Sequence, residues 1–130
     1  MATMQVDGSI STIRGDDIFF EVRLTENDGI TPIDLTGSTI EAQVRSQPNG
    51  YLSLRFQVLQ VNPFTDATYD LTNGEFGLFA AHDSTEEYPG TEGLRKEEYL
   101  WDLQHTSAGD QVTTIIGPAA FHVIRDVTLV

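Results

Sequence analysis

The chain has 130 residues, of which 39% are hydrophobic, so it is the size of one domain spanning 1–130 with a single core that buries about two thirds of its unfolded surface. Twenty acidic residues against seven basic ones give a net charge of -13, which repels phosphate backbones and anionic lipids and makes nucleic acid and membranes poor partners. The absence of cysteine excludes disulfides and thiolate chemistry. Because no apolar run approaches a membrane span and no signal peptide is visible, we expect a soluble chain made in a cytoplasm.

Alternating apolar and polar residues predict about eight strands separated by Gly, Asp, Asn and Pro turns. In chain order we expect strands at 9–13, 18–25, 39–46, 52–61, 75–81, 99–104, 112–117 and 120–130. We expect residues 64–73 to form an irregular connection. A single short helical turn could begin at Ser84. The strand count and spacing predict an all-β, immunoglobulin-like antiparallel β-sandwich.

Within each strand, one alternating set of side chains is apolar and predicts the buried face of the sheet. The residues expected in the core are Phe20, Val22, Leu24, Ile40, Val44, Leu54, Phe56, Trp101 and Leu103. Trp101 resembles the core tryptophan of an immunoglobulin sandwich, although the cysteines that would frame it are absent. The resemblance to immunoglobulin domains therefore extends only to the sandwich architecture.

The chemistry-bearing residues are scattered along the chain. His82, His105 and His122 lack the paired spacing of a metal motif, and no nucleophile elbow or phosphate loop is present. Adjacent acids such as Asp16-Asp17 or Glu97-Glu98 suit either a calcium site or a solvated loop, but no calcium-loop spacing accompanies them. We therefore expect a protein that is not an enzyme and has no cofactor or bound metal.

Polar and aromatic side chains near the turns are the candidates for an interface. We single out Tyr51, Tyr69, Tyr88 and Arg95. Outward-facing Arg23, Arg45 and Arg55 could pair across strands with Glu21 or Glu41, or could make bidentate contacts to a partner. The pattern leaves both roles open.

Four blocks in a fixed order resemble a known phage family. They are Ile13-Arg14-Gly15-Asp16, the connector at 31–37, the strand at 99–104 and the closing Asp126-Val127-Thr128. Together they resemble the β-sandwich domain of tailed-bacteriophage baseplate and tail-fibre proteins, the kind found at the N-terminus of baseplate upper proteins. The long loops at 64–73 and 85–96 depart from that pattern.

The resemblance implies a non-enzymatic virion structural protein. It would be a tail or baseplate component, or an adaptor, that attaches fibres or neighbouring subunits as part of a homo-oligomer. Its partners would be other virion proteins. Two alternatives stay open: a capsid decoration (cement) protein, and a carbohydrate-binding module whose exposed tyrosines stack on sugar rings.

Overall fold

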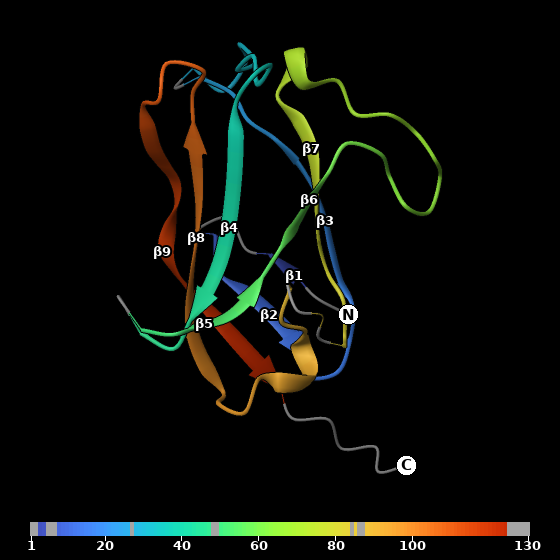
Figure 1. The fold of residues 1–130 in the computed structure, drawn as a ribbon, viewed down its shortest axis with the longest axis vertical. Coiled ribbons are helices and arrows are strands. Elements are labelled where there is room, and N and C mark those ends of the chain that lie inside the picture. The colour runs from blue at the N-terminus through green and yellow to red at the C-terminus, as the bar shows by residue number, and fades with distance from the viewer. Residues whose placement is uncertain are drawn as a thin grey trace.

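Two β-sheets pack face to face in the computed structural model, which describes residues 3–4, 8–26, 28–47, 50–83, 85 and 88–124 (Figure 1). One sheet has the strand order β1-β2-β9-β8-β4-β5, and the other has the order β3-β7-β6. The strands are β1 (Thr3–Met4), β2 (Ile10–Ile13), β3 (Ile18–Arg23), β4 (Thr39–Arg45), β5 (Leu52–Arg55), β6 (Gln57–Leu59), β7 (Glu75–Ala80), β8 (Glu98–Thr106) and β9 (Val112–Ile124).

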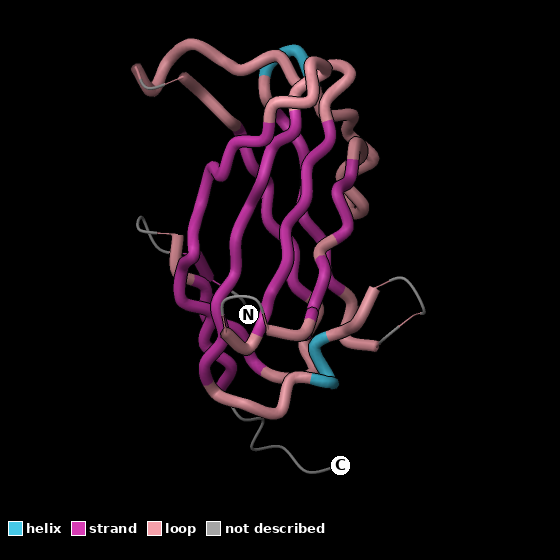
Figure 2. Tube along the Cα trace, turned by 60° about the vertical axis from the view of Figure 1, so that its left-hand side comes forward, coloured by secondary structure: helices cyan, strands magenta, loops and turns pink. Residues whose placement is uncertain are grey.

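The predicted all-β sandwich is confirmed, with one departure from purely antiparallel pairing. Strand β2 runs parallel to β9, with Ile10 opposite Phe121. The described helical structure consists of two 3-10 turns, η1 (Leu71–Asn73) and η2 (Thr91–Gly93), which lie at opposite ends of the sandwich (Figure 2). The helical turn expected at Ser84 begins outside the described residues.

The single strand predicted over 52–61 is wrong, because this segment serves both sheets. Strand β5 pairs with β4, whereas β6 pairs with β7 of the other sheet. Phe56 stands at the crossing, where its backbone N–H donates to the carbonyl of Ala42 over 3.0 Å and its side chain is 2% exposed. The inward alternation continues through Phe56 because both sheets face the same core, so the pattern does not signal the change of sheet.

The two strands predicted at 112–117 and 120–130 are wrong as separate elements. The structure has one long strand, β9, with a bulge at Gly117 and Pro118. Opposite the bulge, the register passes from Trp101 facing Ala119 to Leu103 facing Ile116. Proline interrupts a ladder and therefore imitates a strand end in the sequence. The closing Asp126-Val127-Thr128 block lies outside the described residues.

The hydrophobic core lies between the sheets and includes the side chains expected there. Leu24, Val44, Leu54, Phe56, Trp101 and Leu103 are buried, while Phe20, Val22 and Ile40 are partly buried against them. Trp101 is 1% exposed and packs edge-on against Phe56, with ring centroids 6.0 Å apart. Its indole N–H donates to the carbonyl of Gly8 over 2.7 Å, which ties the segment before β2 to β8.

Replacing Gly74 should destabilise the fold far more than replacing Gly29. Both have nearly the same positive φ, +73° and +72°, but a Cβ on Gly74 would lie 2.3 Å from the carbonyl oxygen of Leu24, whereas nothing lies within 4 Å at Gly29. We expect Gly29→Ala to lower the free energy of unfolding by about 1 kcal/mol through backbone strain alone. Gly74→Ala should cost about 3 kcal/mol or more because the clash adds to that strain. Urea unfolding measures both, and equal costs would contradict the packing described at Gly74.

Candidate functional site

The outer surface of the three-stranded sheet carries a cluster of large apolar side chains. We call it the aromatic face, and its members are Phe19, Leu59, Phe64, Tyr69 and Phe79. Phe19 lies directly opposite Phe79 in the neighbouring strand, so both point to the same side of the sheet. Phe64 packs edge-on against Phe19 with ring centroids 5.4 Å apart and is still 72% exposed.

A glycine in the middle strand allows this cluster to lie close to the sheet. A Cβ on Gly77 would lie 3.1 Å from the ring of Phe19 and 3.2 Å from the ring of Tyr69. The loop that carries Phe64 and Tyr69 folds back on itself through an antiparallel bridge between Val61 and Thr68. This loop projects beside β6 and β7 (Figure 1), and the Phe64 ring that it carries is largely exposed.

A hydrogen-bonded pair joins the loop to the far strand of the sheet. The Tyr69 hydroxyl donates to the Glu21 carboxylate over 2.9 Å, and the Asn62 side chain approaches the same oxygen at 3.4 Å. Desolvation, together with the hydrogen bond to Glu21, raises the pKa of the Tyr69 phenol. The aromatic face therefore has a defined geometry, because these bonds cross from the loop to β3.

Strand β3 provides an open edge beside the aromatic face. It pairs with β7 on one side and, among the described strands, with none on the other. With six residues it is longer than the other described edge strands, which have two to four. An unpaired edge presents backbone N–H and C=O groups that a strand of another chain can bind. Phe19 belongs to both features, so the open edge and the aromatic face form one continuous surface.

The surroundings of this surface are acidic. Glu21, Asp66, Asp70 and Glu75 lie on β3, in the loop or at the start of β7. Arg23 lies among them, opposite Glu75, and its guanidinium donates to the Asn73 side chain over 3.5 Å. A ligand with basic groups around an apolar centre would match this charge.

The four side chains proposed from the sequence as an interface do not form one site. Tyr69 lies in the aromatic face, whereas Tyr51 is 92% exposed immediately before β5. The ring of Tyr88 lies 5.6 Å from the guanidinium of Arg55, and Arg95 donates to the backbone carbonyl of Glu92. The sequence reasoning missed Phe19 and Phe64, although an aromatic residue on the polar parity of a strand and another in a polar loop were visible signals.

The outward arginines make mostly local contacts. Arg55 lies 3.9 Å from the Glu41 carboxylate, which fits the expected cross-strand pairing. Arg45 instead donates to the Gly50 carbonyl and to the Gln43 side chain, each over 2.7 Å. The guanidinium of Arg45 is therefore held in place along the outer face of the six-stranded sheet.

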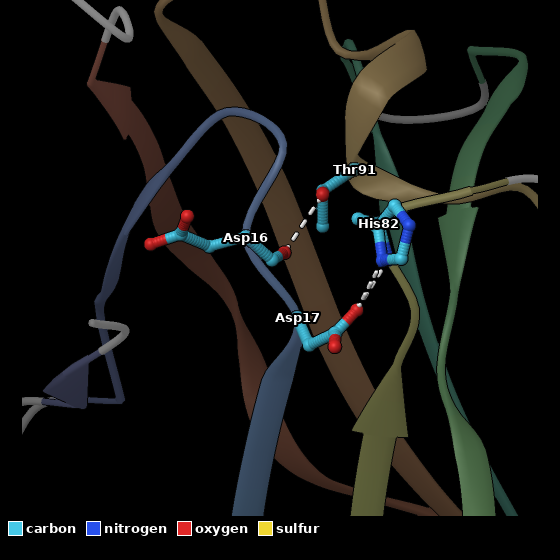
Figure 3. Close-up of polar contacts among 4 residues, drawn as sticks. All are labelled: Asp16, Asp17, His82 and Thr91. Carbon is cyan, nitrogen blue, oxygen red and sulfur yellow. Dashed lines mark hydrogen bonds and ion pairs between the residues drawn. The ribbon is translucent and has the colours of Figure 1, made fainter. Parts of the chain in front are cut away.

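A polar clasp joins the turn before β3 to the loop after β7 (Figure 3). Asp17 accepts hydrogen bonds from the His82 ring over 2.8 Å and from the His82 backbone over 2.7 Å. The buried Thr91 hydroxyl donates to the Asp16 carbonyl over 2.8 Å. The hydrogen bond from His82 lowers the pKa of Asp17, and the same bond raises the pKa of His82. The clasp therefore fixes the turn that leads directly into Ile18, the first residue of β3.

The described residues show no grouping of three or more His, Asp or Glu side chains that could hold a metal ion. His82 and Asp17 are half exposed, while His105 and His122 lie on β8 and β9. No helix in the described part of the chain is long and apolar enough to cross a membrane. A scan against protein-family models finds no match to this chain, and a search of the curated proteins finds none either.

The clasp should make stability depend on pH in a defined window. Because the folded pKa of His82 lies above 6.5, its contribution is complete below pH 6.5 and is lost as pH rises through the folded value. The folded pKa of Asp17 lies below 3.8, so its contribution is complete above pH 3.8 and is lost as pH falls through the lower, folded pKa. The difference in Tm between the wild type and His82→Asn should therefore be largest between these limits. A constant difference from pH 3 to 9 would argue against the clasp.

Proposed function

We propose that this chain is a non-enzymatic attachment module that binds a neighbouring protein subunit through β3 and the aromatic face. The observation that carries the proposal is the continuity of an open six-residue strand edge with an exposed aromatic ring, which meet at Phe19. Main-chain pairing along β3 would supply affinity and register, and the rings would anchor one side of the added strand.

The acidic surroundings favour a partner of opposite charge. Glu21, Asp66, Asp70 and Glu75 surround the apolar centre, and the whole chain carries a charge of -13. Two copies meeting through this same surface would bring these acids together, which is unfavourable. The homo-oligomer implied by the family resemblance would therefore use other surfaces, and the aromatic face would bind a different protein with Lys or Arg around apolar side chains.

The resemblance to the baseplate and tail-fibre domain gives the proposal its biological setting. In that setting the chain is a virion protein, made in the host cytoplasm, that attaches fibres or neighbouring subunits at the tail or baseplate. Two of the four quoted blocks lie next to β3 in the chain: Ile13-Arg14-Gly15-Asp16 leads into it, and the connector at 31–37 comes after it, with Ile33 donating its backbone N–H to the Leu24 carbonyl. A capsid decoration protein would use the same surface at a different place on the particle.

Removing the exposed ring should impair assembly without impairing folding. Phe64→Ser removes a side chain that is 72% exposed, so the free energy of unfolding should change by about 0.5 kcal/mol or less. If Phe64 anchors the partner, the loss of binding should approach about 2 kcal/mol, roughly a thirtyfold loss of affinity. We expect phage that encode this variant to contain much less of the chain, measured by quantitative mass spectrometry of purified particles.

Val112→Ser is the matched control for that experiment. Val112 is also apolar and is 60% exposed, but it lies at the start of β9 in the other sheet. Particles should incorporate this variant as they do the wild type. Equal incorporation of Phe64→Ser and the wild type would refute the role given to the aromatic face, and absence of the wild-type chain from purified particles would refute the virion assignment.

A further inference from the structure

A second surface, on the opposite side of the sandwich, has the features of a ligand site. The outer face of the six-stranded sheet contains a groove of about 570 Å³ that runs over β4, β8 and β9. Its polar lining comes mainly from Glu41, Gln43, Arg45, Asp102 and Gln104, with Pro118 on its flank. The volume lies within the range of small-molecule sites.

Strand register brings these side chains together on one face. Glu41 lies opposite Gln104, and Gln43 lies opposite Asp102. Directly opposed residues of antiparallel strands point to the same side of a sheet. Since Trp101 points into the core, its neighbour Asp102 must point outward into the groove. The polar side chains are thus aligned in two rows, one on β4 and one on β8.

The bulge in β9 shapes the groove beside Asp102. Gly117 and Pro118 together oppose this one residue, and a Cβ on Gly117 would lie 2.5 Å from the Trp101 carbonyl oxygen and 2.9 Å from the Asp102 Cβ. The backbone of β9 therefore approaches β8 closely at this point. Bulges recur next to functional sites, where they change the direction of side chains.

Several polar groups in the groove have hydrogen-bonding capacity left over. Within the described part of the chain, neither the Asp102 carboxylate nor the Gln104 amide has a side-chain hydrogen-bond partner. Desolvation raises the pKa of Asp102, while the nearby charge of Arg45 opposes that rise. Gln43 uses its amide oxygen to accept from Arg45, which leaves its NH₂ group available as a donor. A ligand that both donates and accepts hydrogen bonds would satisfy these groups.

The local charge balance narrows the class of ligand. The negative charges of Glu41 and Asp102 are balanced by two arginines. Arg45 also lines the groove, and Arg55 lies 3.9 Å from the Glu41 carboxylate. This small region is therefore close to neutral, although the chain as a whole carries a charge of -13. A basic peptide would gain more from the acidic surroundings of the aromatic face, and an anionic ligand would be repelled by Asp102.

We propose that this groove binds a neutral oligosaccharide, whose hydroxyls pair with Asp102, Gln104 and Gln43 and whose apolar ring face lies against Pro118. Carboxylate and amide groups are planar and can each bond two neighbouring hydroxyls, which both donate and accept. This site is separate from the aromatic face and does not depend on the attachment function. It also differs from sugar stacking on Tyr51, Tyr69 or Tyr88, since none of these tyrosines lines the groove.

The test begins with a glycan array that carries neutral and charged oligosaccharides, followed by calorimetric titration of the strongest neutral ligand. Asp102→Asn and Gln104→Ala should each weaken that binding roughly tenfold or more, because each removes hydrogen bonds, some of them to a charged group. The matched controls are Asp110→Asn, in the exposed turn between β8 and β9, and Gln60→Ala, in the exposed segment after β6. Both controls should bind within about twofold of the wild type.

Chemical-shift mapping on the wild-type protein locates the site even where a variant folds poorly. Addition of the neutral ligand should shift the backbone amides of Gln43, Asp102 and Gln104. The proposal is overturned if no neutral glycan binds, if Asp102→Asn and Gln104→Ala bind like the wild type, or if the shifts centre on Tyr51 or Tyr88. Binding confined to charged saccharides, or to Lys-rich peptides, would also overturn it.

Discussion

The contact between Trp101 and Phe56 is the constraint on which both outer surfaces depend. Trp101 lies on β8 near the middle of the larger sheet, and Phe56 marks the point where the chain crosses to the smaller one. The indole N–H also holds the carbonyl of Gly8. One buried side chain therefore connects the central strand, the crossing and the segment before β2. Burying these rings also favours folding through the hydrophobic effect.

The same constraint decides which side chains face outward. Because Trp101 is inward, Asp102 must lie on the outer face of the larger sheet. Because β6 continues past Phe56 into the smaller sheet, the loop that follows it can fold across the outer side of that sheet and place Phe64 against Phe19. A protein-binding surface and a saccharide-binding groove on opposite faces would let the domain hold a neighbouring subunit while presenting the other face to a ligand.

The core was predictable from the sequence because burial in a strand follows a local alternation of period two. Val44, Leu54, Trp101 and Leu103 can each be assigned an inward position from a few neighbouring residues. The crossing at Phe56 was not predictable in this way, since an inward residue looks the same whichever sheet it joins. The bulge at Gly117 was mistaken for a strand end because its effect depends on the register of β9 against β8.

The two proposed binding surfaces are non-local and were harder to predict. Phe19 and Phe64 are separated by 45 positions and meet only because the loop returns to β3. The groove needs Gln43 opposite Asp102, which depends on the pairing of β4 with β8. By contrast, exposed tyrosines such as Tyr51 are conspicuous in the sequence, yet the fold does not gather them into a site.

We propose that this chain is a phage virion protein, so a density map of purified particles would test the proposed attachment function most directly. We predict that a strand of a neighbouring protein pairs along Ile18–Arg23 and that its side chains cover Phe64. The basic groups of that neighbour should lie near Glu21, Asp66 and Glu75. A map in which the chain is present but β3 and Phe64 face solvent would contradict this function, and so would a particle that lacks the chain.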